Sequence, residues 1–432
     1  MKQKLKQLIN LSKSATAKDT YLVFIGNSLA GFIGMVLMVI ISRFLGPADF
    51  GAFSVSFSLF MLLGKFGDMG LNFAMVKNIS QSRAKKEPGR IGKIFNTVFW
   101  SKILLFLLMV LLGCVFFDKI VLGLFGFSTH SFVNKYLIIL FVFFVFYDLV
   151  RVFFEAKKHF LKSVLMYFIS NLLKLVMVIV IILFLPNLKN LFIYIYVFAP
   201  FIIGLAFFPK TNLKIRFIFD KKEFKHLFDF ASWMAVSVFF AAIGENLNVF
   251  MVAAKLSNFQ AGIYSAAEKF ILPFYIFAGA LATVLVPRAS EFLEIKHIKA
   301  FIKKIVIIQL AFLALCFLIM PLTVLLPHIL GKSYSASVVI LQILIIGSFF
   351  RVAITPLNSV FYPLNKSLIF AIDSVVQVVG LYILNQRFLA IFQAKGAAFS
   401  FLITNVIIFI INYIFLYFLL RQYERKVINL GK

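Results

Sequence analysis

The stretch Leu45-Gly-Pro-Ala-Asp-Phe-Gly-Ala-Phe-Ser54 decides the fold, because a related stretch follows it 211 residues later. The second stretch is Leu256-Ser-Asn-Phe-Gln-Ala-Gly-Ile-Tyr-Ser265, with three identical positions and one pair of aromatic residues. Each stretch makes a short turn between two long apolar runs, and the same offset aligns Lys77 with Arg288. A repeat of about half the chain predicts two similar halves.

Long apolar runs flank both turns and continue along all 432 residues. The chain is 62% hydrophobic and 14% charged, with a mean hydropathy of +1.01. A soluble domain has only about 45–50% apolar residues, so the composition excludes one. Crossing a bilayer takes about 20 apolar residues. The sequence contains twelve such runs, near residues 20–44, 51–76, 94–117, 135–155, 163–185, 191–209, 230–254, 261–287, 305–326, 338–363, 367–386 and 396–420.

Basic residues are distributed unevenly between the segments that connect these runs. The N-terminal tail and every second connecting segment hold thirty Lys and Arg residues, whereas the other segments hold seven. Cytoplasmic segments of membrane proteins carry the excess of Lys and Arg, so we expect both termini in the cytoplasm. The first run is too long for a signal-peptide core and predicts an uncleaved helix. The same distribution explains the net charge of +28 without a nucleic-acid partner.

The repeat and the topology together predict the domain organisation. Each half contains six runs, an even number, so the halves share one orientation and form a parallel repeat. We expect an all-α polytopic membrane fold of about twelve helices, with one six-helix lobe over residues 1–209 and another over residues 230–432. Between them, Asp220-Lys-Lys-Glu223 has the spacing of a capping box. That spacing predicts a short amphipathic helix within residues 210–229 that lies on the inner leaflet.

Basic side chains inside the apolar runs point toward function. A charge near the centre of a bilayer costs roughly 2.5–3.5 kcal/mol on insertion scales, so several charges predict a polar interior that holds an anion. Four of them lie well inside the runs and are the better cavity candidates, whereas three lie nearer the ends and are expected to anchor helices. The first group is Lys65, Lys174, Lys269 and Arg351, and the second is Arg43, Lys102 and Arg151.

Two of these lysines leave alternatives open. Lys65 and Asp68 are three residues apart and share one helix face. Either they form an internal ion pair, or Lys65 faces a cavity while Asp68 tunes it or exchanges a proton. Lys174 stands beside Asn171 with no carboxylate within one turn. It is therefore expected to face a cavity, to pair across helices, or to be neutral.

The acidic residues inside the runs are candidates for ion coupling. Glu245 lies with Asn246 and Asn248 at the polar centre of its run, which suits either a proton or Na⁺ site or plain hydrogen bonding between helices. Asp373 and Gln377 mark a polar stripe four residues apart. Asp68, Glu245 and Asp373 are the three candidates. Glu268 and Lys269 are adjacent, so they are expected to point apart and not to pair.

Catalytic and metal motifs are not found in the sequence. There is no phosphate-binding glycine loop, no nucleophile elbow and no cluster of His or Cys with metal spacing. Cys114 and Cys316 stand singly in apolar runs. We therefore expect a transporter and no enzyme, without catalytic residues, metal or cofactor, driven by a proton or Na⁺ gradient, by the membrane potential or by substrate supply.

Three motifs resemble those of a known family. The stretch from Ile41 to Ser54, followed by Asp68-Met-Gly70-Leu71 and Ile79-Ser80, resembles the N-terminal signature of polysaccharide-unit flippases. These are the O-antigen and capsule lipid-carrier translocases, in the superfamily that also holds multidrug and toxic compound extruders. The stretch from Ala261 to Lys269, with Val286-Pro287-Arg288, is similar to the seventh-to-eighth helix region of the same family.

The resemblance implies a fold and a substrate. It implies two six-helix lobes with alternating access, in a bacterial cytoplasmic membrane, that move an oligosaccharide on polyprenyl diphosphate to the outer leaflet. By analogy Arg43 is a gate or substrate residue. Membrane lipids, a glycan polymerase and chain-length machinery are the other implied partners. An ion-coupled extruder of drugs or cations is the alternative, for which a carboxylate-dominated cavity is expected, and a membrane scaffold without transport is a third hypothesis.

Overall fold

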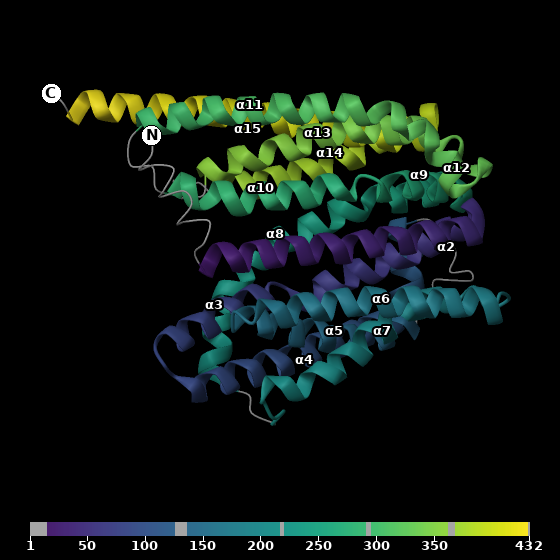
Figure 1. The fold of residues 1–432 in the computed structure, drawn as a ribbon, viewed down its shortest axis with the longest axis horizontal. Coiled ribbons are helices and arrows are strands. Elements are labelled where there is room, and N and C mark those ends of the chain that lie inside the picture. Colours follow the sequence, from purple (N-terminus) through teal and green to yellow (C-terminus); the bar gives the residue numbers. More distant parts are fainter. Residues whose placement is uncertain (1–14, 126–135, 217–219, 291–294, 362–367, 431–432) are drawn as a thin grey trace. The chain divides into compact units, whose positions relative to one another are not determined.

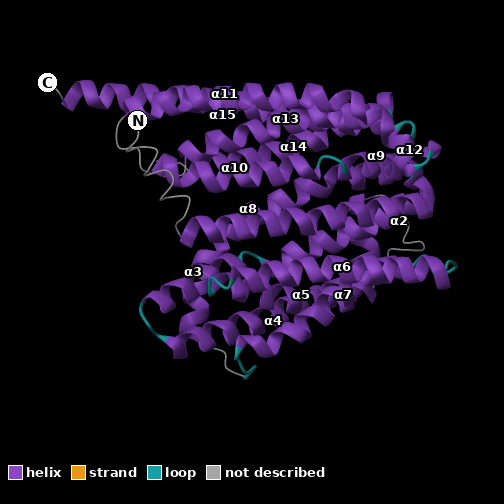
Figure 2. Cartoon of the chain, viewed as in Figure 1, coloured by secondary structure: helices purple, strands orange, loops and turns teal. Residues whose placement is uncertain are grey.

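The computed structural model describes residues 15–125, 136–216, 220–290, 295–361 and 368–430. Within these ranges every regular element is a helix (Figures 1 and 2). In the described part of the chain, nine helical segments are long and apolar enough to cross a membrane. The predicted all-α, multi-pass membrane fold is therefore confirmed.

The helices follow the apolar runs of the sequence, with a few mergers and breaks. Before the middle of the chain they are α2 (Ala15–Asp68), α3 (Leu71–Ala84), α4 (Pro88–Phe125), α5 (Tyr136–Ala156), α6 (Phe160–Phe184) and α7 (Leu191–Phe207). After it come α8 (Lys221–Lys255), α9 (Asn258–Lys269), α10 (Leu272–Ser290), α11 (Ile295–Ile319), α12 (Leu326–Leu330), α13 (Ser337–Phe361), α14 (Leu368–Phe392) and α15 (Ala394–Leu430). Short 3₁₀ turns at Phe208–Thr211, Met320–Leu325 and Lys332–Tyr334 complete the chain.

The long helix α2 contains the first predicted span and most of the second. It changes direction at Gly46, whose φ of +71° and ψ of 172° are not helical. Pro47 follows directly and has no N–H for an intrahelical hydrogen bond. A positive φ is accessible to glycine at little cost, so the Gly-Pro pair explains why the turn between the two runs lies at this point.

Packing divides the chain into two compact units. The first unit comprises Met1–Phe44 and Val55–Ala242, and the second comprises Leu45–Ser54 and Ile243–Lys432. In the first unit α5 packs against α6 and α7, and in the second α15 packs against α13 and α14 (Figure 1). The boundaries fall inside α2 and inside α8, so each of these helices contributes to both units. The sequence had placed the division at residues 210–229.

The predicted short helix in that linker is longer than expected. The predicted N-cap is confirmed, because Asp220 Oδ1 accepts hydrogen bonds from the backbone N–H groups of Lys222 at 3.0 Å and Glu223 at 3.2 Å. From Lys221 to Lys255 no proline interrupts the helix, so it continues into the seventh predicted span. The Glu223 carboxylate pairs with Arg90 of α4, at 2.7 Å between Nε and Oε1.

The two repeated turns meet within the second unit. A Cβ atom on Gly51 would overlap the backbone carbonyl of Asn258, and a Cβ on Gly262 would overlap the backbone carbonyl of Pro47. These four positions correspond in pairs under the 211-residue offset. The α9 helix begins here, where the Ser257 side chain caps the Gln260 N–H at 3.2 Å. The reciprocal contact agrees with the repeat that the sequence predicts.

Candidate functional site

Lys102 is the centre of a buried polar cluster in the first unit. Its side chain is only 2% exposed. The ammonium Nζ lies 2.8 Å from Asn72 Oδ1, 3.0 Å from Asp68 Oδ1 and 3.6 Å from Asp148 Oδ2. These partners come from α3, α2 and α5, so one lysine of α4 joins four helices.

Further contacts extend this cluster along α5. The Asn72 side-chain amide donates to Asp148 Oδ2 at 2.6 Å. Arg151 pairs with Asp148 at 3.6 Å and with Glu155 at 2.8 Å. Burying charges is tolerable only when they are paired and hydrogen-bonded, and two cations facing three carboxylates meet that condition. We refer to the six residues Asp68, Asn72, Lys102, Asp148, Arg151 and Glu155 as the Lys102 cluster.

The cluster decides between alternatives that the sequence left open. Asp68 pairs with Lys102 and not with Lys65, whose side chain is exposed and lies within electrostatic range of Asp148. Arg151, which was expected to anchor a helix end, pairs with Glu155 one turn further along α5. The prediction that Lys102 anchors a helix end is wrong. Because α4 begins at Pro88, Lys102 lies 14 residues inside it, about 21 Å along the helix axis.

Lys174 is buried inside the first unit. Its Nζ donates to Asn171 Oδ1 at 3.1 Å and lies 5.1 Å from the centre of the Tyr196 ring. The Asn171 amide is fixed in turn by the backbone carbonyl of Ala30 in α2, at 3.0 Å. A cation over an aromatic face is stabilised by the ring quadrupole. The lysine therefore bridges neighbouring helices and is covered in this conformation.

A second charged group lies in the second unit around Tyr275. The Arg351 guanidinium lies 5.6 Å from the centre of the Tyr275 ring. Tyr275 is also within electrostatic range of Glu245 and Glu268. Lys269 Nζ lies 3.5 Å from Glu268 Oε2. Three of the predicted residues, Glu245, Lys269 and Arg351, thus lie around Tyr275. We refer to Glu245, Glu268, Lys269, Tyr275 and Arg351 as the Tyr275 group.

The pairing of Glu268 with Lys269 corrects the prediction that they point apart. Adjacent residues diverge on a continuous helix, but α9 ends at Lys269. After the last helical residue the long lysine chain can fold back to its neighbour. Both side chains remain partly accessible, at 23% for Lys269 and 22% for Glu268.

The remaining predicted residues lie in other surroundings. Asp373 accepts hydrogen bonds from the Asn412 amide at 2.9 and 3.0 Å. Asn248 is used for hydrogen bonding between helices, because it donates to the Tyr264 hydroxyl at 2.8 Å and accepts from Asn385 at 2.7 Å. Arg43 is exposed near the end of the first straight part of α2.

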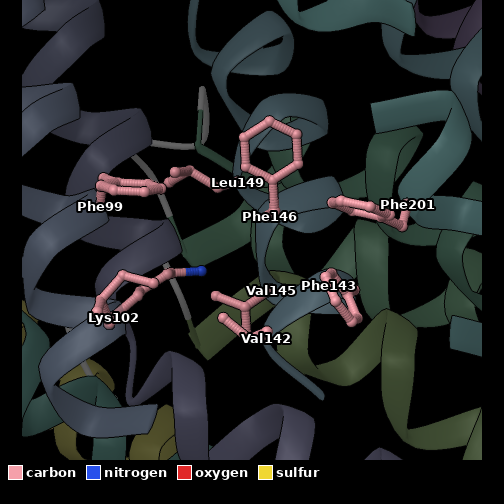
Figure 3. A pocket seen from close by; sticks show the side chains of 9 residues that line it. Phe99, Lys102, Val142, Phe143, Val145, Phe146, Leu149 and Phe201 are labelled. Atoms are coloured by element: carbon pink, nitrogen blue, oxygen red, sulfur yellow. The ribbon is translucent and has the colours of Figure 1, made fainter. Parts of the chain in front are cut away.

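An apolar pocket adjoins the Lys102 cluster within the first unit. It has a volume of about 200 Å³ and lies between α4, α5 and α7 (Figure 3). Four phenylalanine rings and several aliphatic side chains surround it, and Lys102 borders it. The lining residues are Phe99, Lys102, Ile103, Val142, Phe143, Val145, Phe146, Leu149 and Phe201.

Sequence reasoning missed two residues that matter to this geometry. Asn72 and Asp148 hold the Lys102 ammonium, and only Asp148 carried a signal, as an acid inside an apolar run. In the described ranges no group of three His, Cys, Asp or Glu residues is placed to hold a metal ion. The arrangement offers cations, paired carboxylates and an apolar pocket.

Known proteins resemble this chain in sequence and in fold. Residues 16–293 match the family model described as polysaccharide biosynthesis protein. The chain is 27% identical over 203 residues to a Shigella flexneri protein described as an O-antigen transporter, and the match covers 45% of this chain and about half, 48%, of that protein.

Solved structures match over most of the length. An inward-facing multidrug resistance transporter of the MATE family, in the MOP superfamily, gives a TM-score of 0.76 at 13% identity, covering 92% of this chain and 96% of that one. The lipid II flippase MurJ, in an inward closed conformation, gives 0.73 at 16% identity, covering 92% and 87%. At such identities these matches show a shared fold.

Proposed function

Because the chain belongs to the polysaccharide biosynthesis protein family and has the fold of the MOP superfamily, we propose that it is a flippase for lipid-linked oligosaccharides. Its substrate is an oligosaccharide on polyprenyl diphosphate, moved from the cytoplasmic to the outer leaflet for O-antigen, capsule or exopolysaccharide assembly. The family match over residues 16–293 carries the proposal. The relative described as an O-antigen transporter supports it. We place the protein in the bacterial cytoplasmic membrane with both termini inside.

The chemistry of the substrate requires a polar path lined by cations. A diphosphate and a sugar chain cannot enter hydrocarbon without a large desolvation cost. Lys65 of the first unit and, separately, Lys269 and Arg351 of the second are accessible or partly accessible cations on helices of the membrane region, and we assign each of them to contact with the diphosphate during its passage. Arg43 is retained as a gate residue. Lys174 is covered by its own neighbours, so direct contact with substrate would require it to leave Asn171.

The driving force in this proposal is the membrane potential. Two negative charges moving outward across an inside-negative membrane gain about 2.3 kcal/mol each per 100 mV, or roughly 4–5 kcal/mol in total. A coupled proton or Na⁺ at Asp68, Glu245 or Asp373 is the alternative source of energy. Of these, Asp68 is already neutralised by Lys102, so coupling there would require the Lys102 cluster to rearrange.

The decisive experiment removes the gene from a strain without a redundant flippase. Lipid-linked oligosaccharide then accumulates on the cytoplasmic face, and a plasmid copy restores surface glycan. Full surface glycan without the protein would contradict the proposal. If drug susceptibility rises while glycan export is unchanged, the alternative of a drug or cation extruder is favoured. We also propose that a glycan polymerase and chain-length proteins act on the oligosaccharide after its export.

A further inference from the structure

We propose that the pocket between α4, α5 and α7 holds a segment of the prenyl chain of the lipid carrier, an inference that rests on the proposed function. The pocket lies entirely within the first unit (Figure 3). It is separate from the cations assigned to the diphosphate. Lys65, which belongs to the same unit, would bind the head of the substrate, whereas this pocket would bind its tail.

The lining of the pocket excludes water and suits hydrocarbon. The eight lining side chains other than Lys102 are apolar, and four of them are phenylalanines. The Lys102 ammonium is occupied by Asp68, Asp148 and Asn72, so it contributes mainly its aliphatic stem. An apolar cavity of about 150 Å³ stays dry and binds small hydrocarbons. A pocket of about 200 Å³ is large enough for a short length of chain.

A hydrocarbon chain can reach the pocket from the bilayer. Phe143, Phe146 and Phe201 are only half-buried, so the pocket extends to the surface of the unit. Beside it, the exposed side chains on α4 and α7 are apolar, as expected for a surface in contact with lipid. They include Leu104 and Leu107 on α4, at 62% and 55%, and Ile202 and Leu205 on α7, at 48% and 50%.

The position of Lys102 favours a prenyl chain over the acyl chain of a phospholipid. This one residue belongs both to the pocket and to the charged cluster, so apolar and polar surroundings adjoin without an intermediate layer. The cluster itself is not the head-group site, because its carboxylates use its cations; the exposed Lys65, within electrostatic range of Asp148, is the cation on this side. A prenyl diphosphate has the matching construction, because its hydrocarbon is joined directly to the diphosphate. A phospholipid places ester groups between phosphate and chain, and the pocket offers no polar lining for them.

The selectivity of the pocket for a prenyl chain over an acyl chain must come from the shape of its walls. Lipid tails are as apolar as the pocket, so leaving the bilayer gives no hydrophobic gain, and packing against the walls decides binding. The methyl branches of isoprene units can pack between the rings of Phe99, Phe143, Phe146 and Phe201. A straight acyl chain has no branches to fill the spaces between these rings.

The test uses the full-length protein in detergent and two photoreactive probes with the same label. One is a polyprenyl phosphate and the other is phosphatidylglycerol labelled in its acyl chain. Ile103→Trp fills the pocket, whereas Leu107→Trp, one turn further along α4 and exposed to lipid, is the matched control. We expect Ile103→Trp to lower cross-linking of the prenyl probe about fivefold or more, equivalent to roughly 1 kcal/mol. The control and the phosphatidylglycerol signal stay unchanged.

Two cross-linking results would overturn the proposal. Equal prenyl cross-linking in the parent and Ile103→Trp would overturn the proposal. An equal loss for both probes would also overturn it, because the pocket would then accept any bilayer chain. If Ile103→Trp does not run as a single peak on size exclusion, Val142→Phe fills the pocket from α5 and is judged by the same criteria. The binding result is independent of glycan export, so failure of the flippase proposal is seen separately, in the deletion strain.

Discussion

Gly51 and Gly262 lie in direct backbone contact, and each would collide with a carbonyl from the partner turn if it carried a side chain. A built Cβ on Gly262 lies 3.0 Å from the backbone nitrogen of Gly51. The two glycines occupy equivalent positions of the repeat. Their absence of a side chain is therefore a packing requirement that both halves share.

Alanine at either glycine should destabilise the protein. Forcing an extra methyl group into a packed site costs about 1–3 kcal/mol, so Gly51→Ala and Gly262→Ala should both lower the melting temperature. Gly92→Ala is the control, because nothing lies within 4 Å of its built Cβ and it sits in α4. Melting is followed by size exclusion with fluorescence detection. Unchanged melting of both variants would refute the close contact.

Removing the Lys102 ammonium should be far more harmful than removing an exposed one. Lys102→Met leaves the buried Asp68 without its cation and takes one of two cations from the half-buried Asp148. Breaking a buried pair typically costs about 3–5 kcal/mol. Lys93→Met is the control, because Lys93 is 57% exposed and lies 4.0 Å from Asp220. Adding Asp68→Asn to Lys102→Met should recover part of the loss. Equal stability of the two single variants would contradict the description of the Lys102 cluster.

The start of α8 should depend on pH through Asp220. The hydrogen bonds from the backbone amides of Glu223 and Lys222 lower the pKa of this carboxyl, with smaller help from Lys93. A lowered pKa in the folded state means that the cap stabilises the helix above the ordinary Asp pKa of about 3.9. That stabilisation is lost as the pH falls through the folded value.

Hydrogen exchange of the peptide around residues 220–228 measures this effect. Near neutral pH, Asp220→Ala should exchange faster than the parent protein. At acid pH the difference should shrink, because the parent carboxyl is then protonated and accepts weaker hydrogen bonds. A difference that is the same at both pH values would show that the carboxylate charge is not the cause.

Lys65 should affect transport without affecting stability. It is exposed and lies outside the ion pairs of the Lys102 cluster in the described structure. If it contacts the diphosphate, Lys65→Gln removes a charge-assisted interaction worth about 1.5–3 kcal/mol, which corresponds to about tenfold or more in the flipping rate. Lys85→Gln, just after α3, is the exposed control. Reconstituted vesicles with a labelled lipid-linked sugar report the rate, and equal rates would remove Lys65 from the substrate path.

Collapsing the membrane potential should slow flipping in the same vesicles. The inside-negative potential contributes roughly 4–5 kcal/mol for two charges at 100 mV, so an ionophore that removes it should reduce net outward movement. If transport continues at its original rate and still responds to an imposed proton or Na⁺ gradient, ion coupling replaces the potential as the driving force.

Local features of the sequence predicted much of the fold. Apolar runs located the spans, Gly46 and Pro47 located the first turn, and Asp220 located the start of α8. Each of these depends on neighbouring residues alone. The length of α8 was missed because a cap predicts where a helix begins, whereas its end depends on how far no residue interrupts it.

The candidate site was less predictable because its contacts join distant residues. Asp68 finds its partner on α4, 34 residues away, and not at the nearest lysine on its own helix. Lys102 was predicted near a helix end because the apolar run begins near residue 94, whereas α4 begins at Pro88 with polar turns that hydropathy does not detect. Lys269 pairs with Glu268 only because α9 ends there. Pro273 is the sign of that end in the sequence, but the long apolar run over residues 261–287 favoured one continuous helix.

The contact between Gly51 and Gly262 also sets an order of events during biosynthesis. Residues 45–54 leave the ribosome early, yet they pack with a unit whose other residues begin at Ile243. At about 5–20 residues per second, the 211 residues between the glycines take roughly 10–40 s to make. During that time residues 45–54 are without the turn at residues 256–265 that they pack against. A chain whose translation stops before α9 therefore cannot complete the second unit.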